Sequence, residues 1–150
     1  MNLKEQIDLD IKSAMLAKKR EELETLRSIK SQILLAETEK GGEEKLSEET
    51  GNKMLMKMAK QRKESAEIFQ QQNREDLYQK EMFQLEVINR YLPQPLSEEE
   101  LNLSLQEIIN SVQATGLKDM GKVMGLASKK LAGRVDGKVL SEAVKKILTP

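Results

Sequence analysis

Apolar residues recur every three or four positions along most of this chain, which is the spacing of one face of an α-helix. Six or seven segments show this spacing, and none alternates as a half-buried strand does. The second segment has to end by Gly41-Gly42, Ser47 is a suitable N-cap for the third, and Asn73 is suited to close it. In order, the first four expected apolar faces lie within residues 3–15, 23–33, 54–69 and 78–92.

The amino-acid composition agrees with an all-α fold and limits the chemistry. Leu, Glu and Lys are the commonest residues, and only two Tyr and two Phe are present, so helix formers dominate over strand formers. The chain has no His and no Cys, which excludes a Ser-His-Asp triad, a thiolate nucleophile and a zinc site of the usual kind. No cofactor is expected, and the residue types favour a binding protein over an enzyme.

Cellular location can be predicted only from features that are missing. The longest apolar runs are a few residues, far below the roughly 20 that cross a bilayer. Residues 1–14 carry Glu5, Asp8 and Asp10 in an amphipathic pattern and lack the basic start and apolar block of a secretory signal. These features predict a soluble cytoplasmic protein without a membrane partner.

Two prolines in the segment Pro93-Gln94-Pro95 mark the clearest boundary, because neither can continue a helix. Ser97 and Glu100 then have the spacing of a capping box, and Leu96 and Leu101 that of a hydrophobic staple. We therefore predict a helical N-terminal region, 1–92, of long antiparallel helices. A linker, 93–95, joins it to a small helical region, 96–150.

The small region has three expected helices. The first runs from Ser97 to Thr115-Gly116, and the second follows Asp119 as N-cap, with an apolar face from Met120 to Leu131. The last helix follows Asp136 as N-cap and continues to Ile147. Three helices in so few residues form a small core, so this region is expected to depend in part on its neighbour.

Charge is divided unevenly along the chain although the total is zero. Residues 1–92 carry 17 basic and 18 acidic groups, residues 93–117 four Glu and no basic group, and residues 118–150 eight basic and three acidic groups. An anionic partner for the last segment would explain this, and so would simple solvation of its outer helix faces. The candidate phosphate contacts are Lys118, Lys122, Lys129, Lys130, Arg134 and Lys138.

Two glycines lie within the same segment. Gly121 and Gly125 stand four residues apart on one helix face, and each costs about 1 kcal/mol relative to Ala. Close approach of another helix or of a phosphate backbone would explain both. The surrounding residues lack the spacing of a phosphate loop. A second cluster, Gly133-Arg134-Val135-Asp136-Gly137, combines a tight turn with the start of a helix, where anions are favoured, although Asp136 competes.

Five ordered blocks of this sequence resemble the GatB/YqeY family, and specifically its stand-alone YqeY-like members. Together they extend over nearly the whole chain. In order they are Leu23-Glu24-Thr25-Leu26-Arg27-Ser28-Ile29-Lys30, Lys60-Gln61-Arg62-Lys63-Glu64-Ser65, Tyr91-Leu92-Pro93-Gln94-Pro95-Leu96-Ser97-Glu98-Glu99-Glu100-Leu101, Asp119-Met120-Gly121-Lys122-Val123-Met124-Gly125 and Gly133-Arg134-Val135-Asp136-Gly137.

The resemblance implies a two-part all-α protein related to the C-terminal tail of the B subunit of the aspartyl/glutamyl-tRNA amidotransferase. In that subunit the tail contacts tRNA, and catalysis belongs to a separate domain. The stretch from Gly121 to Met124 and the turn at 133–137 are similar to motifs of the tail, except that Val135 stands where a small residue is usual. The resemblance therefore implies tRNA contact for the basic segment, without an amidation centre.

Three functions follow as hypotheses. The first is an accessory module that binds tRNA by shape and charge. The second is an adaptor that docks on an amidotransferase or an aminoacyl-tRNA synthetase. Met54 and Met58 are expected in its core and Met56 on its surface. The third, an amide-forming enzyme, has the least support, because the sequence contains no amidase-type Ser-Lys motif, phosphate loop or metal-ligand cluster.

Overall fold

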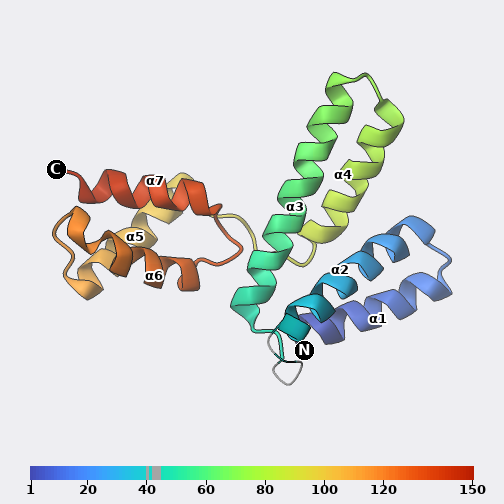
Figure 1. Cartoon of the computed structure of the whole chain (residues 1–150), viewed down its shortest axis with the longest axis horizontal. Helices are drawn as coiled ribbons and strands as arrows, with labels where there is room; N and C mark the ends of the chain where they lie inside the picture. Colours follow the sequence, from blue (N-terminus) through green and yellow to red (C-terminus); the bar gives the residue numbers. More distant parts are fainter. Residues whose placement is uncertain (40, 42–44) are drawn as a thin grey trace. The chain divides into compact units, whose positions relative to one another are not determined.

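The computed structural model describes residues 1–39, 41 and 45–150, and every regular element in these ranges is helical (Figure 1). The all-α prediction is confirmed. The chain divides into two compact units, unit 1 (Met1–Pro93) and unit 2 (Gln94–Pro150). The elements are α1 (Leu3–Leu16), α2 (Arg20–Glu39), α3 (Glu48–Gln71), α4 (Glu75–Asn89), α5 (Glu98–Val112), η1 (Leu117–Asp119), α6 (Met120–Lys130) and α7 (Gly137–Leu148).

Unit 1 consists of two helical hairpins, α1–α2 and α3–α4 (Figure 1). Each hairpin turns at a residue in the left-handed conformation, Lys18 with φ of 56° and Asn73 with φ of 58°. The expected end of the third helix at Asn73 is thus confirmed. Ser47 caps α3 as predicted, since its hydroxyl accepts from the Thr50 amide at 3.1 Å. Helix α2 ends at Glu39, and Gly42 of the predicted Gly41-Gly42 stop lies outside the described residues.

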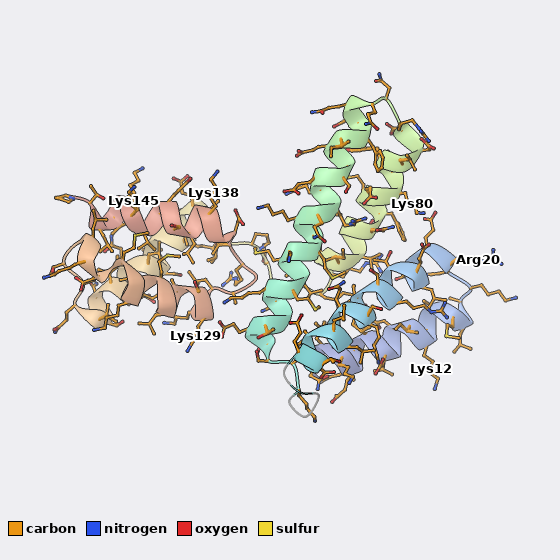
Figure 2. All side chains as sticks on the ribbon, in the orientation of Figure 1. Lys12, Arg20, Lys80, Lys129, Lys138 and Lys145 are labelled. Atoms are coloured by element: carbon orange, nitrogen blue, oxygen red, sulfur yellow. The ribbon has the colours of Figure 1, made fainter. Side chains whose placement is uncertain are left out.

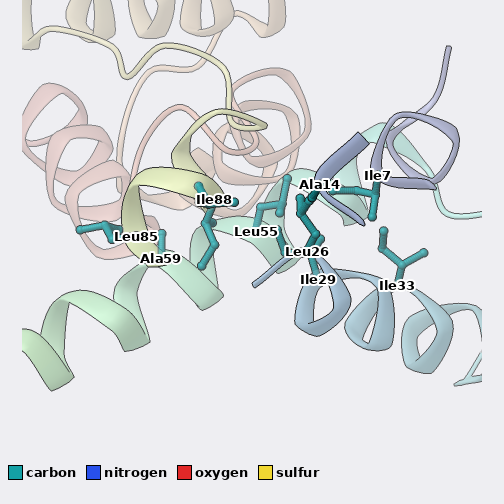
Figure 3. Close-up of a cluster of buried hydrophobic side chains, with 10 residues drawn as sticks. Ile7, Ala14, Leu26, Ile29, Ile33, Leu55, Ala59, Leu85 and Ile88 are labelled. Atoms are coloured by element: carbon teal, nitrogen blue, oxygen red, sulfur yellow. The ribbon is translucent and has the colours of Figure 1, made fainter. Parts of the chain in front are cut away.

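The core of unit 1 gathers side chains from all four helices (Figure 3). Met54 and Met58 pack against it as expected, and Met56 is half-buried. Since apolar residues from both hairpins share one cluster, burial holds the two hairpins together. The buried residues of the cluster are Ile7, Ala14, Leu26, Ile29, Ile33, Leu55, Ala59, Leu85, Val87 and Ile88.

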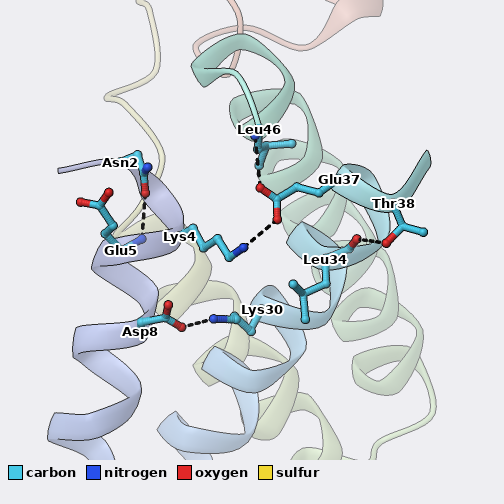
Figure 4. Close-up of polar contacts among 9 residues, drawn as sticks. All are labelled: Asn2, Lys4, Glu5, Asp8, Lys30, Leu34, Glu37, Thr38 and Leu46. Atoms are coloured by element: carbon cyan, nitrogen blue, oxygen red, sulfur yellow. Dashed lines mark hydrogen bonds and ion pairs between the residues drawn. The ribbon is translucent and has the colours of Figure 1, made fainter. Parts of the chain in front are cut away.

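Ion pairs join the helices of unit 1 around this core. Lys4 Nζ lies 2.9 Å from Glu37 Oε1, and Lys30 contacts Asp8, so two pairs connect α1 to α2 (Figure 4). The hydrogen bond from Lys4 is the main cause that lowers the pKa of Glu37. Further pairs join α3 to α4 and α4 to α2, at 2.7 Å for Arg62–Glu81 and 2.5 Å for Arg90–Glu22.

Unit 2 packs α5, α6 and α7 around a second cluster, whose buried members are Leu101, Leu105, Ile108, Ile109, Val123, Ala127, Leu131, Leu140, Val144 and Leu148. Ser97 caps α5 by accepting from the Glu100 amide at 3.1 Å. The Glu100 carboxylate accepts from the Ser97 hydroxyl at 3.0 Å. Leu96 and Leu101 pack in the same cluster, as a hydrophobic staple requires.

The two expected aspartate caps of unit 2 occupy the N-cap positions but do not act as side-chain caps. Asp119 precedes α6 and Asp136 precedes α7, yet neither carboxylate accepts a capping bond from its helix. The Asp119 side chain instead accepts from the Thr115 amide at 2.8 Å. It therefore stabilises the turn that enters α6.

Candidate nucleic-acid interface

The outer face of α6 brings together three of the residues predicted to contact phosphate. Lys122, Gly125 and Lys129 stand at positions i, i+3 and i+7 of the helix, and all three are exposed. Val123 and Ala127 on the opposite side are fully buried in the core of unit 2. Lys118, exposed in η1, precedes Lys122 by one turn. We call Lys118, Lys122 and Lys129, with the two glycines between them, the α6 face.

The lysines of the α6 face are free of ion pairs. Within the part of the chain that the structure describes, no carboxylate lies within 4.0 Å of Lys118, Lys122 or Lys129. The nearest acidic influence is Asp119, whose pKa is lowered mainly by the hydrogen bond from the Thr115 amide and, less strongly, by Lys118 and Lys122. Asp119 therefore offsets part of the positive charge at one end of the face.

Both glycines of the α6 face border open space. A Cβ atom built at Gly121 or Gly125 would have no described atom within 4 Å outside the local helix. Within unit 2, no other described helix packs closely on these glycines, although such packing was one of the two explanations considered for them. Unit 2 therefore leaves the backbone of α6 uncovered at both positions.

Arg134 is engaged inside unit 2. Its Nε donates to the Gln94 carbonyl at 2.9 Å, its own carbonyl accepts from the Leu96 amide at 3.0 Å, and its Nη2 lies 3.8 Å from Glu100. Gly133, with φ of 82°, supplies the left-handed turn before it. The structure thus places Arg134 as a tether that holds the start of unit 2 against the α6–α7 turn.

The remaining predicted contacts do not join the α6 face. Lys130 follows Lys129 directly, so it is rotated by about 100° around the helix. Lys138 lies at the start of α7, and Lys129 and Lys138 extend toward opposite sides of unit 2 (Figure 2). Both are exposed. The six cationic candidates therefore do not form one surface, and three of them share the α6 face.

Unit 1 contains a cavity of about 360 Å³ that sequence reasoning missed. Tyr91 at its wall donates a hydrogen bond to Asp10, and burial together with this carboxylate raises the pKa of the phenol. Arg90 pairs with Glu22 beside it. Asp10 and Tyr91 are 81 residues apart, so no local pattern signals their contact. The full lining is Gln6, Asp10, Ser13, Ala14, Ala17, Lys19, Glu22, Arg90 and Tyr91.

Metal sites and membrane spans are both absent from the described part of the chain. Over residues 1–39, 41 and 45–150, no group of three or more Asp or Glu side chains is placed to hold a metal ion. Among the same residues, no helix combines the length and apolar character needed to cross a membrane.

This geometry defines a class of protein: a two-unit helical protein whose second unit carries a basic face without ion pairs among the described residues. Residues 4–148 match the family model described as Yqey-like protein. The chain therefore belongs to the YqeY-like family, and the resemblance seen in its five sequence blocks is confirmed.

Several curated proteins are similar to this chain in sequence. One from Clavispora lusitaniae, named Altered inheritance of mitochondria protein 41, mitochondrial, is 39% identical over 72% of this chain and 63% of its own length. Proteins of the same name from Meyerozyma guilliermondii and Pyrenophora tritici-repentis are 37% and 27% identical, over 78% and 95% of this chain and 62% and 78% of theirs. The chain spans less than two thirds of the Clavispora relative.

The predicted cytoplasmic location is wrong by this comparison. The relatives from Clavispora, Meyerozyma and Pyrenophora are all named as mitochondrial proteins. The error has a physical reason: the absence of a secretory signal and of an apolar span does not distinguish one aqueous compartment from another.

Proposed function

We propose that unit 2 binds tRNA through the α6 face. The observation that carries this proposal is a set of three exposed lysines without ion pairs among the described residues, arranged around a helix backbone that the rest of unit 2 leaves uncovered. Phosphate groups contacted by such lysines release counterions, which supplies affinity without reading sequence. Gly125 lies between Lys122 and Lys129, where the absence of a side chain lets a sugar-phosphate backbone come close.

The kind of nucleic acid follows from two further arguments. Unit 2 contains no aromatic residue, so base stacking cannot dominate, and recognition of RNA shape is favoured over recognition of sequence. The resemblance to the amidotransferase tail supports tRNA over other RNA. The accessory role proposed here, in connection with tRNA-dependent amidotransfer, includes no chemical step carried out by this chain.

Fluorescence anisotropy with labelled bulk tRNA tests the proposal. We expect log K to fall against log salt with a slope of roughly −2 to −4, because about three to five phosphates are neutralised. The double variant Lys122→Gln/Lys129→Gln should bring that slope closer to zero by about 2, since each phosphate contact contributes about one unit.

A matched control comes from the same unit. Lys145 and Lys146 are exposed on α7, and the variant Lys145→Gln/Lys146→Gln removes the same charge from unit 2. It should leave the slope within error of wild type. Equal effects of the two variants, or no binding of tRNA by the wild type at low salt, would overturn the proposal.

The adaptor function makes a different prediction for the native protein. A partner retained through the α6 face by RNA should be lost after nuclease treatment or at high salt. Retention of an amidotransferase or an aminoacyl-tRNA synthetase under both conditions would contradict RNA-mediated association and support direct docking of that enzyme.

A further inference from the structure

We infer that unit 1 carries a second contact for the RNA phosphate backbone, formed by Lys57, Lys60 and Lys63 on α3. We call these three residues the α3 ridge. The inference rests on the proposed tRNA binding and assigns part of it to the other unit. It draws on the Lys60–Ser65 block, which the α6 face leaves without a role.

The ridge follows from the spacing of its residues. Positions i, i+3 and i+6 of an α-helix form an oblique row at about 45° to the axis. All three lysines are exposed, whereas Leu55 and Ala59 of the same helix are buried in the core of unit 1. The row extends over about 9 Å of helix at 1.5 Å per residue, enough for several charges to meet neighbouring phosphates of one strand.

The charged residues in this part of α3 are all basic. From Thr50 to Lys63 the helix contains five basic residues and no acidic one. Two of the five are already paired within unit 1: Lys53 lies 3.1 Å from Glu49, and Arg62 lies 2.7 Å from Glu81 on α4. The three that remain form the ridge.

The ridge lysines stay unpaired even though acidic residues follow them. Glu64 and Glu67 stand four positions after Lys60 and Lys63, yet neither pair comes within 4.0 Å among the described residues. On a helix, an ion pair is weaker when the basic residue precedes the acidic one, because this order of charges opposes the helix dipole. The ridge thus offers free positive charge, which complements a polyanion.

Four cations of unit 1 pair with acidic residues of another helix, as Lys4, Lys30, Arg62 and Arg90 do. The ridge departs from this arrangement, since its lysines are exposed and form no ion pair among the described residues. An exposed row of like charges is mildly unfavourable by itself, and binding of an anion relieves that repulsion. The geometry therefore assigns the ridge to an external polyanion.

Anisotropy titrations with the full chain and labelled bulk tRNA test this assignment over a series of potassium chloride concentrations. The ridge variant is Lys57→Gln/Lys60→Gln/Lys63→Gln. We expect it to bind tRNA about tenfold more weakly at low salt and to lose about 1 to 2 units of salt slope, which is the part of the slope that the α6 face leaves. Circular dichroism should show wild-type helicity, because the three side chains are exposed. The control variant removes the same charge from other exposed positions of unit 1, Lys12, Lys45 and Lys80.

The outcomes separate this inference from the proposed function. A ridge variant that behaves like the control overturns the ridge, and it leaves the α6 face to be judged from the Lys122→Gln/Lys129→Gln variant in the same assay. Loss of tRNA binding in the ridge variant alone supports the ridge and overturns the α6 face. Competition with polyglutamate is the last test. If polyglutamate at equal charge concentration displaces tRNA from the wild type but not from the ridge variant, the ridge prefers acidic protein and the RNA assignment fails.

Discussion

The two units of this protein differ in where their ion pairs lie. In unit 1, basic side chains on three helices reach across to acidic side chains on a neighbouring helix, as Lys4, Arg62 and Arg90 do. In unit 2, the ion pair found among the described residues joins Arg134 to Glu100 at 3.8 Å, and the lysines of the α6 face have no such partner. Unit 1 therefore has ion pairs between its helices, whereas the lysines of the α6 face in unit 2 have none among the described residues.

The hydrophobic cores of the two units also differ, in the number of buried residues relative to the length of the unit. Ten buried residues form each cluster, although unit 1 extends from Met1 to Pro93 and unit 2 only from Gln94 to Pro150. Unit 2 thus obtains more of its cohesion per residue from apolar burial, which requires no partner of opposite charge. A helix can then expose unpaired lysines without loss of the contacts that hold it.

The largest expected effect tests whether the core of unit 2 is cooperative by itself. Leu105 is fully buried on α5, so Leu105→Ala should lower the free energy of unfolding of unit 2 by about 2–5 kcal/mol. Hydrogen exchange should show faster exchange in α5, α6 and α7 and unchanged exchange in α1 and α2.

Leu103, 64% exposed on the same helix, provides the control, and Leu103→Ala should change stability by less than about 0.5 kcal/mol. Equal acceleration of exchange in both units by Leu105→Ala would contradict separate cores. It would then support the sequence-based expectation that the small region depends on its neighbour.

A smaller effect is expected from a polar link in unit 1. Tyr91→Phe removes the hydrogen bond to Asp10 that ties the end of α4 to α1, and it should destabilise the protein by about 1–2 kcal/mol. Chemical denaturation measures the change. Tyr78→Phe is the matched control, because Tyr78 is also half-buried and its hydroxyl makes no hydrogen bond among the described contacts. A similar loss in both variants would show that the Asp10 contact contributes nothing specific.

One substitution in unit 2 is expected to stabilise the protein. Gly125→Ala should raise the free energy of unfolding by about 0.5–1 kcal/mol, since alanine favours the helix and the new Cβ meets no described atom. The same substitution should weaken tRNA binding, because it places a methyl group between Lys122 and Lys129. Thermal unfolding and anisotropy measure the two effects. Tighter tRNA binding by this variant would argue against close backbone approach.

The smallest effect is a pH dependence. The pKa of Asp119 lies below its ordinary value of 3.8, so its carboxylate stabilises the fold above that value and loses this contribution as pH falls through the folded pKa. Asp119→Asn should therefore destabilise the protein more at neutral pH than near pH 3. A difference between wild type and variant that does not change with pH would contradict this role.

Local features of the fold are predictable because their causes lie within a few residues. The left-handed turn at Asn73, the break at Pro93 and the Ser97 cap each depend on one turn of chain, and the structure has all three. Asp119 shows the limit of such reasoning. Its predicted position as N-cap is correct, but its carboxylate accepts from Thr115 behind it. Two nearby amides compete for one side chain, and only the folded turn decides between them.

By itself, the sequence determined the helical segments, the division of charge along the chain and the residues able to face the core, because helix periodicity and composition are local properties. Tertiary structure decided which lysines share a face. Helices α6 and α7 pack by their apolar sides, so Lys129 and Lys138 turn to opposite sides of unit 2 although nine positions separate them. Packing likewise joined Asp10 to Tyr91 and Glu22 to Arg90, since contacts between distant segments form only where burial of apolar surface brings their helices together.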